Sequence, residues 1–257
     1  MFKFVVWVLK LLPFLLWNYF RYIIPYSRHP EKYPLQERYD RVRYMILKCL
    51  KTFKVKIHVN DFPKNSKRYY FVVNHVSLLD PVVLIASSKE PILFIAKKQT
   101  RNMMFVGQMF RAIDGLFLDR GNLRQEIKVY GEIKKWLNED ISNVTLFPEG
   151  TRNKSYNAPL NEFKPGSLKP AFVTDTLILP VVVWGTQFVL NKRYNYKRYN
   201  VYINFLEEVD PKEYKDTVTL AKDLEDTMQA KVNEARDFQK KMLGHKLTKR
   251  QIKHLNS

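Results

Sequence analysis

The spacing of hydrophobic residues changes near residue 55 of the chain. The first 26 residues are almost continuously apolar, and the run over residues 4–20 is interrupted only by Lys10 and Pro13. This run is at the lower limit of the ~17–25 apolar residues that a helix needs to span a bilayer. We therefore expect residues 1–54 to form a membrane-associated helical segment, which either crosses the bilayer or enters one leaflet.

Aromatic and basic side chains in this segment predict which way the protein faces. The aromatic residues are of the types that sit at the headgroup level of a membrane, namely Trp7, Trp17, Tyr19, Tyr22 and Tyr26. Basic residues follow them along the chain, and these suit the anionic cytoplasmic leaflet. We expect attachment to the cell membrane with the bulk of the chain, residues 55–243, on the cytoplasmic side.

A second helix is predicted over residues 35–54. Its apolar residues recur at steps of three and four, and they are Tyr39, Val42, Met45, Ile46, Cys49, Leu50 and Phe53. Arginines and lysines occupy the positions between them. Such a helix either lies on a membrane or packs its apolar stripe on the protein core, and the sequence leaves both alternatives open.

Short apolar runs that alternate with helical stretches follow from about residue 55. Strands are predicted at residues 69–73, 92–96, 115–118, 144–147, 177–183 and 201–205. Helices are predicted at residues 81–88, 101–112, 122–138, 167–174 and 217–243. The last of these helices should dock on the core with one apolar face, made by Leu220, Leu224, Met228, Val232, Ala235 and Phe238. This alternation is typical of an α/β fold with a central, mostly parallel or mixed sheet flanked by helices. We expect this domain over residues 55–243, followed by a basic tail over residues 244–257.

Composition and charge limit the partners. The chain has 257 residues and a formal charge of +19, so polyanions, anionic lipid or an acidic carrier protein should be attracted to it. Basic and aromatic residues alternate over residues 194–199, which alone would suit single-stranded nucleic acid. The apolar N-terminus and the groups described next have no use in such a protein, so we expect no nucleic-acid partner. One cysteine and five scattered histidines indicate no metal site.

The clearest candidate chemistry lies where the predicted strand 69–73 ends. Asn74 and His75 follow the strand, and Asp80 with Pro81 is a good helix start. A loop between the two could let the Asp80 carboxylate accept a hydrogen bond from one ring nitrogen of His75, which leaves the other nitrogen as a general base for a substrate hydroxyl. The alternative is that Asp80 only caps its helix. Ser77 lacks the surroundings of a serine nucleophile and reads as a loop residue.

Two other predicted strands also end in polar residues. One ends at Asp119 and Arg120, where the arginine could bind an anion. The other leads into Glu149, Gly150, Thr151 and Arg152, where the glycine permits a positive φ and the next two residues supply donors. Ligands of open α/β sheets bind where strands end, so these loops could form one site.

Glu149 and three further basic residues have simpler alternative roles. Glu149 could pair with Arg120 or Arg152 to hold the loops, and that role is compatible with substrate binding by the same side chain. Lys97, Lys98 and Arg101 follow another predicted strand. They could contact an anion as well, although a solvated charge run is the commoner role of such residues.

Four blocks in this order resemble one family. The span from Asn74 to Asp80 is similar to the NHxxxxD signature of the 1-acyl-sn-glycerol-3-phosphate acyltransferases and their glycerolipid relatives. Residues 115–120, 147–152 (FPEGTR) and 179–181 resemble the second, third and fourth blocks of that family, and residues 163–166 resemble a later basic-glycine step. The sequence departs from the family pattern at Val76 and Asn153, which bears on substrate preference rather than on chemistry.

The resemblance implies an enzyme. It implies acyl transfer from a thioester of acyl carrier protein or coenzyme A to the sn-2 hydroxyl of a lysophosphatidate, with no further cofactor. His75 would take the hydroxyl proton and Asp80 would orient it, while Asn74 and nearby N–H groups would hold the oxyanion. The resemblance places the glycerophosphate site at Arg120, Glu149, Gly150, Thr151 and Arg152. A related enzyme acting on another lysolipid or on glycerol-3-phosphate is the alternative, and the oligomeric state stays open.

Overall fold

A computed structural model describes residues 2–60, 68–119, 121–153, 155–189, 191 and 197–243. The chain divides into two compact units: Met1–Val55 with Pro81–Thr145, and Lys56–Asp80 with Leu146–Ser257. The boundary expected after residue 54 lies beside the break after Val55, whereas the α/β domain expected over residues 55–243 contributes to both units. The expected basic tail lies outside the described residues.

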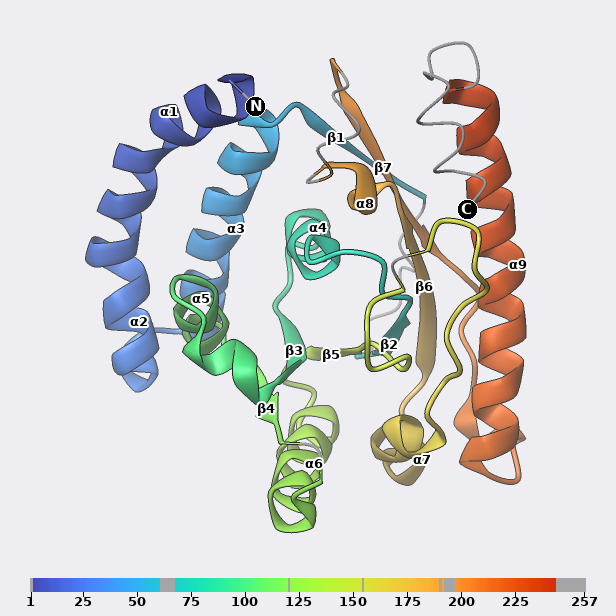
Figure 1. The fold of residues 1–257 in the computed structure, drawn as a ribbon. Helices are drawn as coiled ribbons and strands as arrows, with labels where there is room; N and C mark the ends of the chain where they lie inside the picture. The colour runs from blue at the N-terminus through green and yellow to red at the C-terminus, as the bar shows by residue number, and fades with distance from the viewer. Residues whose placement is uncertain are drawn as a thin grey trace. The chain divides into compact units, whose positions relative to one another are not determined.

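The first unit contains most of the helices (Figure 1). They are α1 (Phe2–Asn18), α2 (Ile24–Arg28), α3 (Leu35–Thr52), α4 (Asp80–Ser87, whose first residue belongs to the second unit), α5 (Val106–Ala112) and α6 (Leu123–Asn138). Its strands are β3 (Ile92–Lys97), β4 (Leu116–Leu118) and β5 (Asn143–Leu146). Strand β3 pairs in parallel with both β4 and β5.

The second unit contains the other strands, in the order β1, β7, β6, β2. These are β1 (Val55–Val59), β2 (Tyr70–Val73), β6 (Ile178–Trp184) and β7 (Tyr199–Phe205). Its helices are α7 (Lys169–Thr174), α8 (Thr186–Val189) and α9 (Thr217–Leu243), and α9 lies along β6 (Figure 1). Strands β2 and β6 are parallel, whereas β6 and β7 are antiparallel.

The mostly parallel pairing confirms the predicted α/β fold with a mixed sheet flanked by helices. Each strand predicted from the sequence is present to within two residues of its expected bounds. Strand β1 and the single turn α8 were not predicted. All four residues of β2 are buried, as expected of a parallel strand, because parallel strands are covered on both faces.

Helix α3 packs its apolar stripe inside the first unit. Tyr39, Val42 and Met45 are buried, so the stripe is part of the core rather than a face lying on a membrane. Arg38 is buried as well, and its guanidinium donates to both carboxylate oxygens of Asp114 at 2.7 Å. This bidentate pair joins α3 to the turn that follows α5, because Arg presents its donors in a planar fork that matches a carboxylate.

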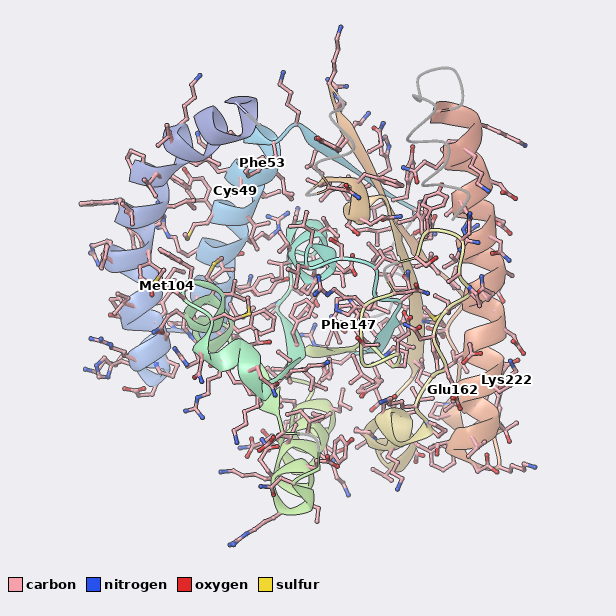
Figure 2. All side chains as sticks on the ribbon, viewed as in Figure 1. Cys49, Phe53, Met104, Phe147, Glu162 and Lys222 are labelled. Atoms are coloured by element: carbon pink, nitrogen blue, oxygen red, sulfur yellow. The ribbon has the colours of Figure 1, made fainter. Side chains whose placement is uncertain are left out.

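Helix α1 forms where the apolar N-terminus predicts a helix, and it runs beside α3 (Figure 1). Among the described residues, no helix combines the length and the apolar character that crossing a membrane would require. Several large apolar side chains of the first unit are nevertheless exposed, and we call them the apolar surface of the first unit: Leu9, Leu12, Trp17, Phe20, Tyr44, Leu47, Met103, Met104 and Val106. Met104 projects from the segment just before α5 (Figure 2).

Helix α9 has the predicted bounds, but its core-facing stripe differs from the prediction near its C-terminal end. Leu220, Leu224, Met228 and Val232 are buried as expected. Phe238, which was expected on the same face, is 49% exposed, and Gln239 is buried in its place. The indole nitrogen of Trp184 donates to the Gln239 side chain. The buried indole N–H needs an acceptor, so glutamine rather than an apolar residue faces the core at this point.

Candidate active site

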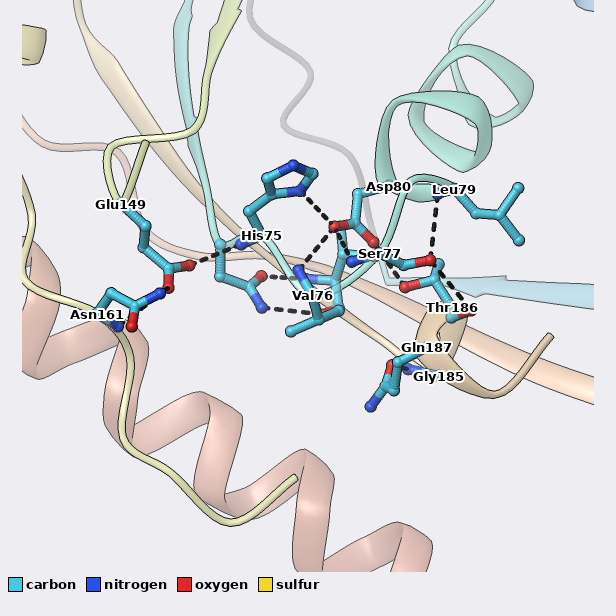
Figure 3. Close-up of polar contacts among 12 residues, drawn as sticks. His75, Val76, Ser77, Leu79, Asp80, Glu149, Asn161, Gly185, Thr186 and Gln187 are labelled. Atoms are coloured by element: carbon cyan, nitrogen blue, oxygen red, sulfur yellow. Dashed lines mark hydrogen bonds and ion pairs between the residues drawn. The ribbon is translucent and has the colours of Figure 1, made fainter. Parts of the chain in front are cut away.

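His75 and Asp80 form a hydrogen-bonded pair in the second unit. His75 follows the end of β2, and its Nδ1 lies 2.8 Å from Oδ2 of Asp80 (Figure 3). The Asp80 side chain is fully buried, whereas 18% of the His75 side chain is exposed. A carboxylate can only accept, so Nδ1 carries a proton, and in the neutral imidazole Nε2 then has the lone pair. No described residue hydrogen-bonds to Nε2, which points away from Asp80 (Figure 3).

Asp80 faces the loop before its helix rather than the helix itself. Its Oδ2 also accepts the backbone N–H groups of Val76 and Ser77, each at 2.8 Å. The alternative in which Asp80 only caps its helix is therefore wrong. Several donors on one buried carboxylate offset the cost of removing its charge from water, and the same bonds hold the carboxylate against the imidazole.

Thr186, at the start of α8, completes the surroundings of Asp80. Its hydroxyl donates to Asp80 Oδ1 at 2.6 Å, and Thr186 is fully buried. The Ser77 hydroxyl donates to the Thr186 carbonyl at 3.4 Å and accepts the backbone N–H of Leu79 at 3.2 Å. Ser77 is therefore engaged in loop contacts, as expected of a loop residue, and not with the imidazole.

Glu149 holds the backbone of His75. Its Oε1 accepts the His75 backbone N–H at 2.7 Å, and its Oε2 accepts the backbone and side-chain nitrogens of Asn161 at 3.0 and 2.8 Å (Figure 3). Burial raises the pKa of the Glu149 carboxyl, and the hydrogen bonds from His75 and Asn161 act in the opposite direction. Among the described residues Glu149 has no ion pair with Arg152. Glu149 therefore holds loops together through two backbone N–H groups and the Asn161 amide rather than through Arg152, and the expected alternative of a pair with Arg120 lies outside the described residues.

Helix α9 positions the segment 157–163 that carries Asn161. Glu225 and Gln229 accept backbone N–H groups from this segment at 2.8 and 2.6 Å. Arg236 donates to two of its carbonyl oxygens at 3.2 and 3.0 Å. A chain of contacts therefore runs from α9 through the segment and Glu149 to the backbone of His75.

Phe147 lies against the imidazole ring. The ring centroids of Phe147 and His75 are 4.2 Å apart with an interplanar angle of 29°. Offset stacking of this kind restricts the ring to one orientation and covers one of its faces. The His75 carbonyl also accepts the backbone N–H of Asn153 at 2.7 Å, so both backbone groups of His75 are held by the loop that follows β5.

Asn74 is paired with a neighbouring strand, and its expected role in holding an oxyanion stays a prediction. Asn74 is fully buried, its amide nitrogen donates to the Val183 carbonyl at 3.1 Å, and its amide oxygen accepts the Val183 N–H at 2.7 Å. The amide continues the pairing of β2 with β6 beyond Val73. The amide nitrogen has two N–H donors and one of them is bonded to Val183, while the second is buried with the rest of the side chain.

The other expected anion contacts are distributed unevenly. Gly150 has a φ of +67°, as its predicted turn requires, and it precedes the exposed Thr151 and the half-buried Arg152. Arg120 lies outside the described residues. In the first unit, Lys98 forms an ion pair with Asp119 at 2.7 Å, while Lys97 and Arg101 are exposed.

Thr186, Asn161 and Phe147 were not assigned roles from the sequence. Phe147 lies within the FPEGTR block, so its position next to Glu149 was a usable signal. Thr186 and Asn161 have no local signal, because their partners are 106 and 12 residues away. Within the described part of the chain, no three histidine, cysteine or acidic side chains are grouped to hold a metal ion.

Fold and site together define an α/β protein that presents a carboxylate-supported imidazole at the end of a buried parallel strand. A family model described as Acyltransferase matches residues 54–184. The chain belongs to this acyltransferase family, which confirms the resemblance seen in its sequence blocks.

Similar proteins carry more specific names. A Mycoplasma genitalium protein named "Probable 1-acyl-sn-glycerol-3-phosphate acyltransferase" is 31% identical over 200 residues, which cover 72% of this chain and 73% of the relative. A Borreliella burgdorferi 1-acyl-sn-glycerol-3-phosphate acyltransferase is 30% identical over 152 residues, covering 58% of this chain and 59% of the relative. The crystal structure of the acyltransferase PlsC from Thermotoga maritima has the same fold, with a TM-score of 0.69 at 24% identity over 90% of this chain and 94% of that chain.

Proposed function

We propose that this protein transfers a fatty acyl group from an acyl thioester to the sn-2 hydroxyl of 1-acyl-sn-glycerol-3-phosphate, which yields phosphatidate. The observation that carries the proposal is the His75 imidazole, with Nδ1 hydrogen-bonded to the buried Asp80 at 2.8 Å and Nε2 left to accept a proton. Membership of the acyltransferase family and the names of the similar proteins supply the reaction class and the acceptor.

In the proposed reaction, His75 acts as the general base. Nε2 takes the proton of the acceptor hydroxyl while the oxygen attacks the thioester carbonyl carbon. The tetrahedral intermediate then collapses, the carbon–sulfur bond breaks, and the thiolate takes the proton from the imidazolium. The Asp80 carboxylate stabilises the imidazolium between these two proton transfers, and no acyl-enzyme forms.

The acceptor phosphate would bind the guanidinium of Arg152, which is half-buried and has no acidic partner among the described residues. Arginine suits this role because its fork of donors matches the oxygens of a phosphate. Gly150 permits the turn that presents Thr151 and Arg152, and Arg120 remains the second proposed contact. Glu149 contributes by holding His75 rather than by touching the substrate.

We place the enzyme at the cytoplasmic face of the cell membrane. A lysophosphatidate keeps its acyl chain in the bilayer and its hydroxyl at the headgroup level, so a site at the interface reaches it without extraction. The apolar surface of the first unit, where Trp17 is 67% and Met104 is 76% exposed, suits insertion into one leaflet. The charge of +19 favours anionic lipid and an acidic acyl carrier protein.

Acyl transfer by purified protein tests the proposal. The assay offers lysophosphatidate, glycerol-3-phosphate or lysophosphatidylcholine as acceptor, each with acyl carrier protein and coenzyme A thioesters as donors. We expect turnover of lysophosphatidate and its loss in His75→Ala, while His29→Ala serves as the control because His29 is exposed on a short loop. Preference for another acceptor would overturn the substrate, and turnover retained in a folded His75→Ala protein would overturn the mechanism.

A further inference from the structure

We propose that Thr186 is a positioning residue whose hydroxyl fixes the rotation of the Asp80 carboxylate, and thereby the orientation of His75. The kinetic part of this inference rests on the proposed acyl transfer, whereas the structural part does not. Thr186 lies at the start of α8, five residues after the fourth block, and its hydroxyl bonds Asp80 rather than the imidazole.

The two carboxylate oxygens of Asp80 have unequal surroundings. Oδ2 accepts three N–H donors, all from the neighbouring residues 75–77. Oδ1 accepts one donor, the Thr186 hydroxyl at 2.6 Å. Local chain geometry therefore holds one oxygen, and only a residue 106 positions away holds the other. Without the hydroxyl, Oδ1 would be a buried carboxylate oxygen with no described donor.

The turn between β6 and α8 is built to present this hydroxyl. Gly185 has a φ of +101°, and a Cβ at this position would approach the Asn200 carbonyl oxygen to 2.4 Å. No other residue fits this conformation and this space without strain. The Gly185 N–H donates to the Gln187 side chain at 2.9 Å, which closes the turn on the other side of Thr186. Thr186 is thus held from both sides and fully buried.

The orientation matters because the charge on the imidazole changes during the reaction. When Nε2 takes the proton, the imidazolium is stabilised only if Asp80 Oδ2 stays in line with Nδ1. An unpaired Oδ1 would favour rotation of the carboxylate toward other donors or water. Stabilisation of the imidazolium would be lost in the transition state and not in substrate binding. Removing the hydroxyl should therefore lower kcat and leave KM nearly unchanged.

Three substitutions test the inference. Thr186→Val keeps the shape and removes the hydroxyl, Thr186→Ser keeps the hydroxyl, and Thr145→Val is the matched control. Thr145 is also fully buried, and its hydroxyl has no partner among the described residues. We expect Thr186→Val to lower kcat about 10-fold to 100-fold with KM for lysophosphatidate nearly unchanged. Thr186→Ser should retain most of the activity, and Thr145→Val should retain all of it.

A spectroscopic measurement separates this inference from the proposed function. In the unaltered protein the His75 Nδ1 proton should give a sharp downfield NMR signal. The signal is assigned to His75 by its disappearance in His75→Ala. Thr186→Val should broaden or shift that signal, while Thr186→Ser and Thr145→Val should leave it in place. An unchanged signal in folded Thr186→Val would overturn the inference even if the protein transfers no acyl group. A rise in KM without a fall in kcat would overturn it as well.

Discussion

Replacing Asp80 by Asn removes one charge and almost no volume. Three N–H donors lie on Oδ2, so the amide oxygen should take that place and the amide nitrogen should face Thr186. The Thr186 hydroxyl can then accept instead of donate, since a hydroxyl does both. We therefore expect Asp80→Asn to fold and to keep a neutral hydrogen bond to His75.

The expected loss is the electrostatic stabilisation of the imidazolium. The two groups are in hydrogen-bond contact at 2.8 Å, and the centres of their delocalised charges are about 4 Å apart, so their attraction is about 4 kcal/mol at an effective dielectric constant of about 20. The neutral amide restores about 1 kcal/mol of this through its remaining hydrogen bond. The difference of about 3 kcal/mol corresponds to a fall in kcat of about 100-fold.

The assay measures kcat at saturating lysophosphatidate and thioester, alongside thermal unfolding followed by circular dichroism. Asp226→Asn is the control, because Asp226 is an exposed carboxylate on α9 that pairs only with Lys222 among the described residues. It undergoes the same chemical change on the surface and should have the activity of the unaltered protein. A folded Asp80→Asn protein with a kcat within about threefold of the unaltered protein would refute the electrostatic role of Asp80.

Two further predictions concern the support of the site and attachment to lipid. Burial raises the folded-state pKa of Glu149, so the free energy of unfolding should fall, relative to that of Glu149→Gln, as the pH rises from 4.5 through this raised pKa. Urea unfolding at several pH values tests this, with exposed Glu207→Gln as the control. A free energy of unfolding that rises with pH relative to that of Glu149→Gln would contradict the prediction. Trp17→Ala with Phe20→Ala should weaken sedimentation with anionic vesicles about 10-fold to 100-fold, since each side chain is about two-thirds exposed and free to enter lipid. Equal weakening in the exposed control pair Ile127→Ala and Val218→Ala would contradict a specific apolar surface.

Periodicity predicted most of the secondary structure because each signal was local. The bounds of α9 and, to within two residues, of the six predicted strands follow from the spacing of apolar residues within short windows. Strand β1 was missed even though its alternation Val-Lys-Ile-His-Val is typical of a strand half exposed at a sheet edge. It directly follows α3, so the change of hydrophobic spacing at residue 55 marks both the end of a helical segment and the start of this strand.

The candidate site was predictable as far as its members share one segment. His75 and Asp80 are five residues apart, and the strand end and the helix start around them restrict the loop enough to predict their contact. The buried pairing of Asn74 with Val183 was not predictable, because 109 residues separate the two. The sequence suggested a polar group free for substrate, while the neighbouring strand uses both of its hydrogen-bonding atoms.

Local order along the chain therefore determined the α/β elements, the family blocks and the His–Asp pair, since each depends on groups held within a few residues by backbone geometry. Only the packing of distant strands and helices decided which groups support that pair: Thr186 on Asp80, and Glu149 with Asn161 on the backbone of His75. The physical reason is that a buried polar atom must form a hydrogen bond, and its partner comes from whichever element packs against it. That element can be distant in the sequence, so residue spacing does not identify it.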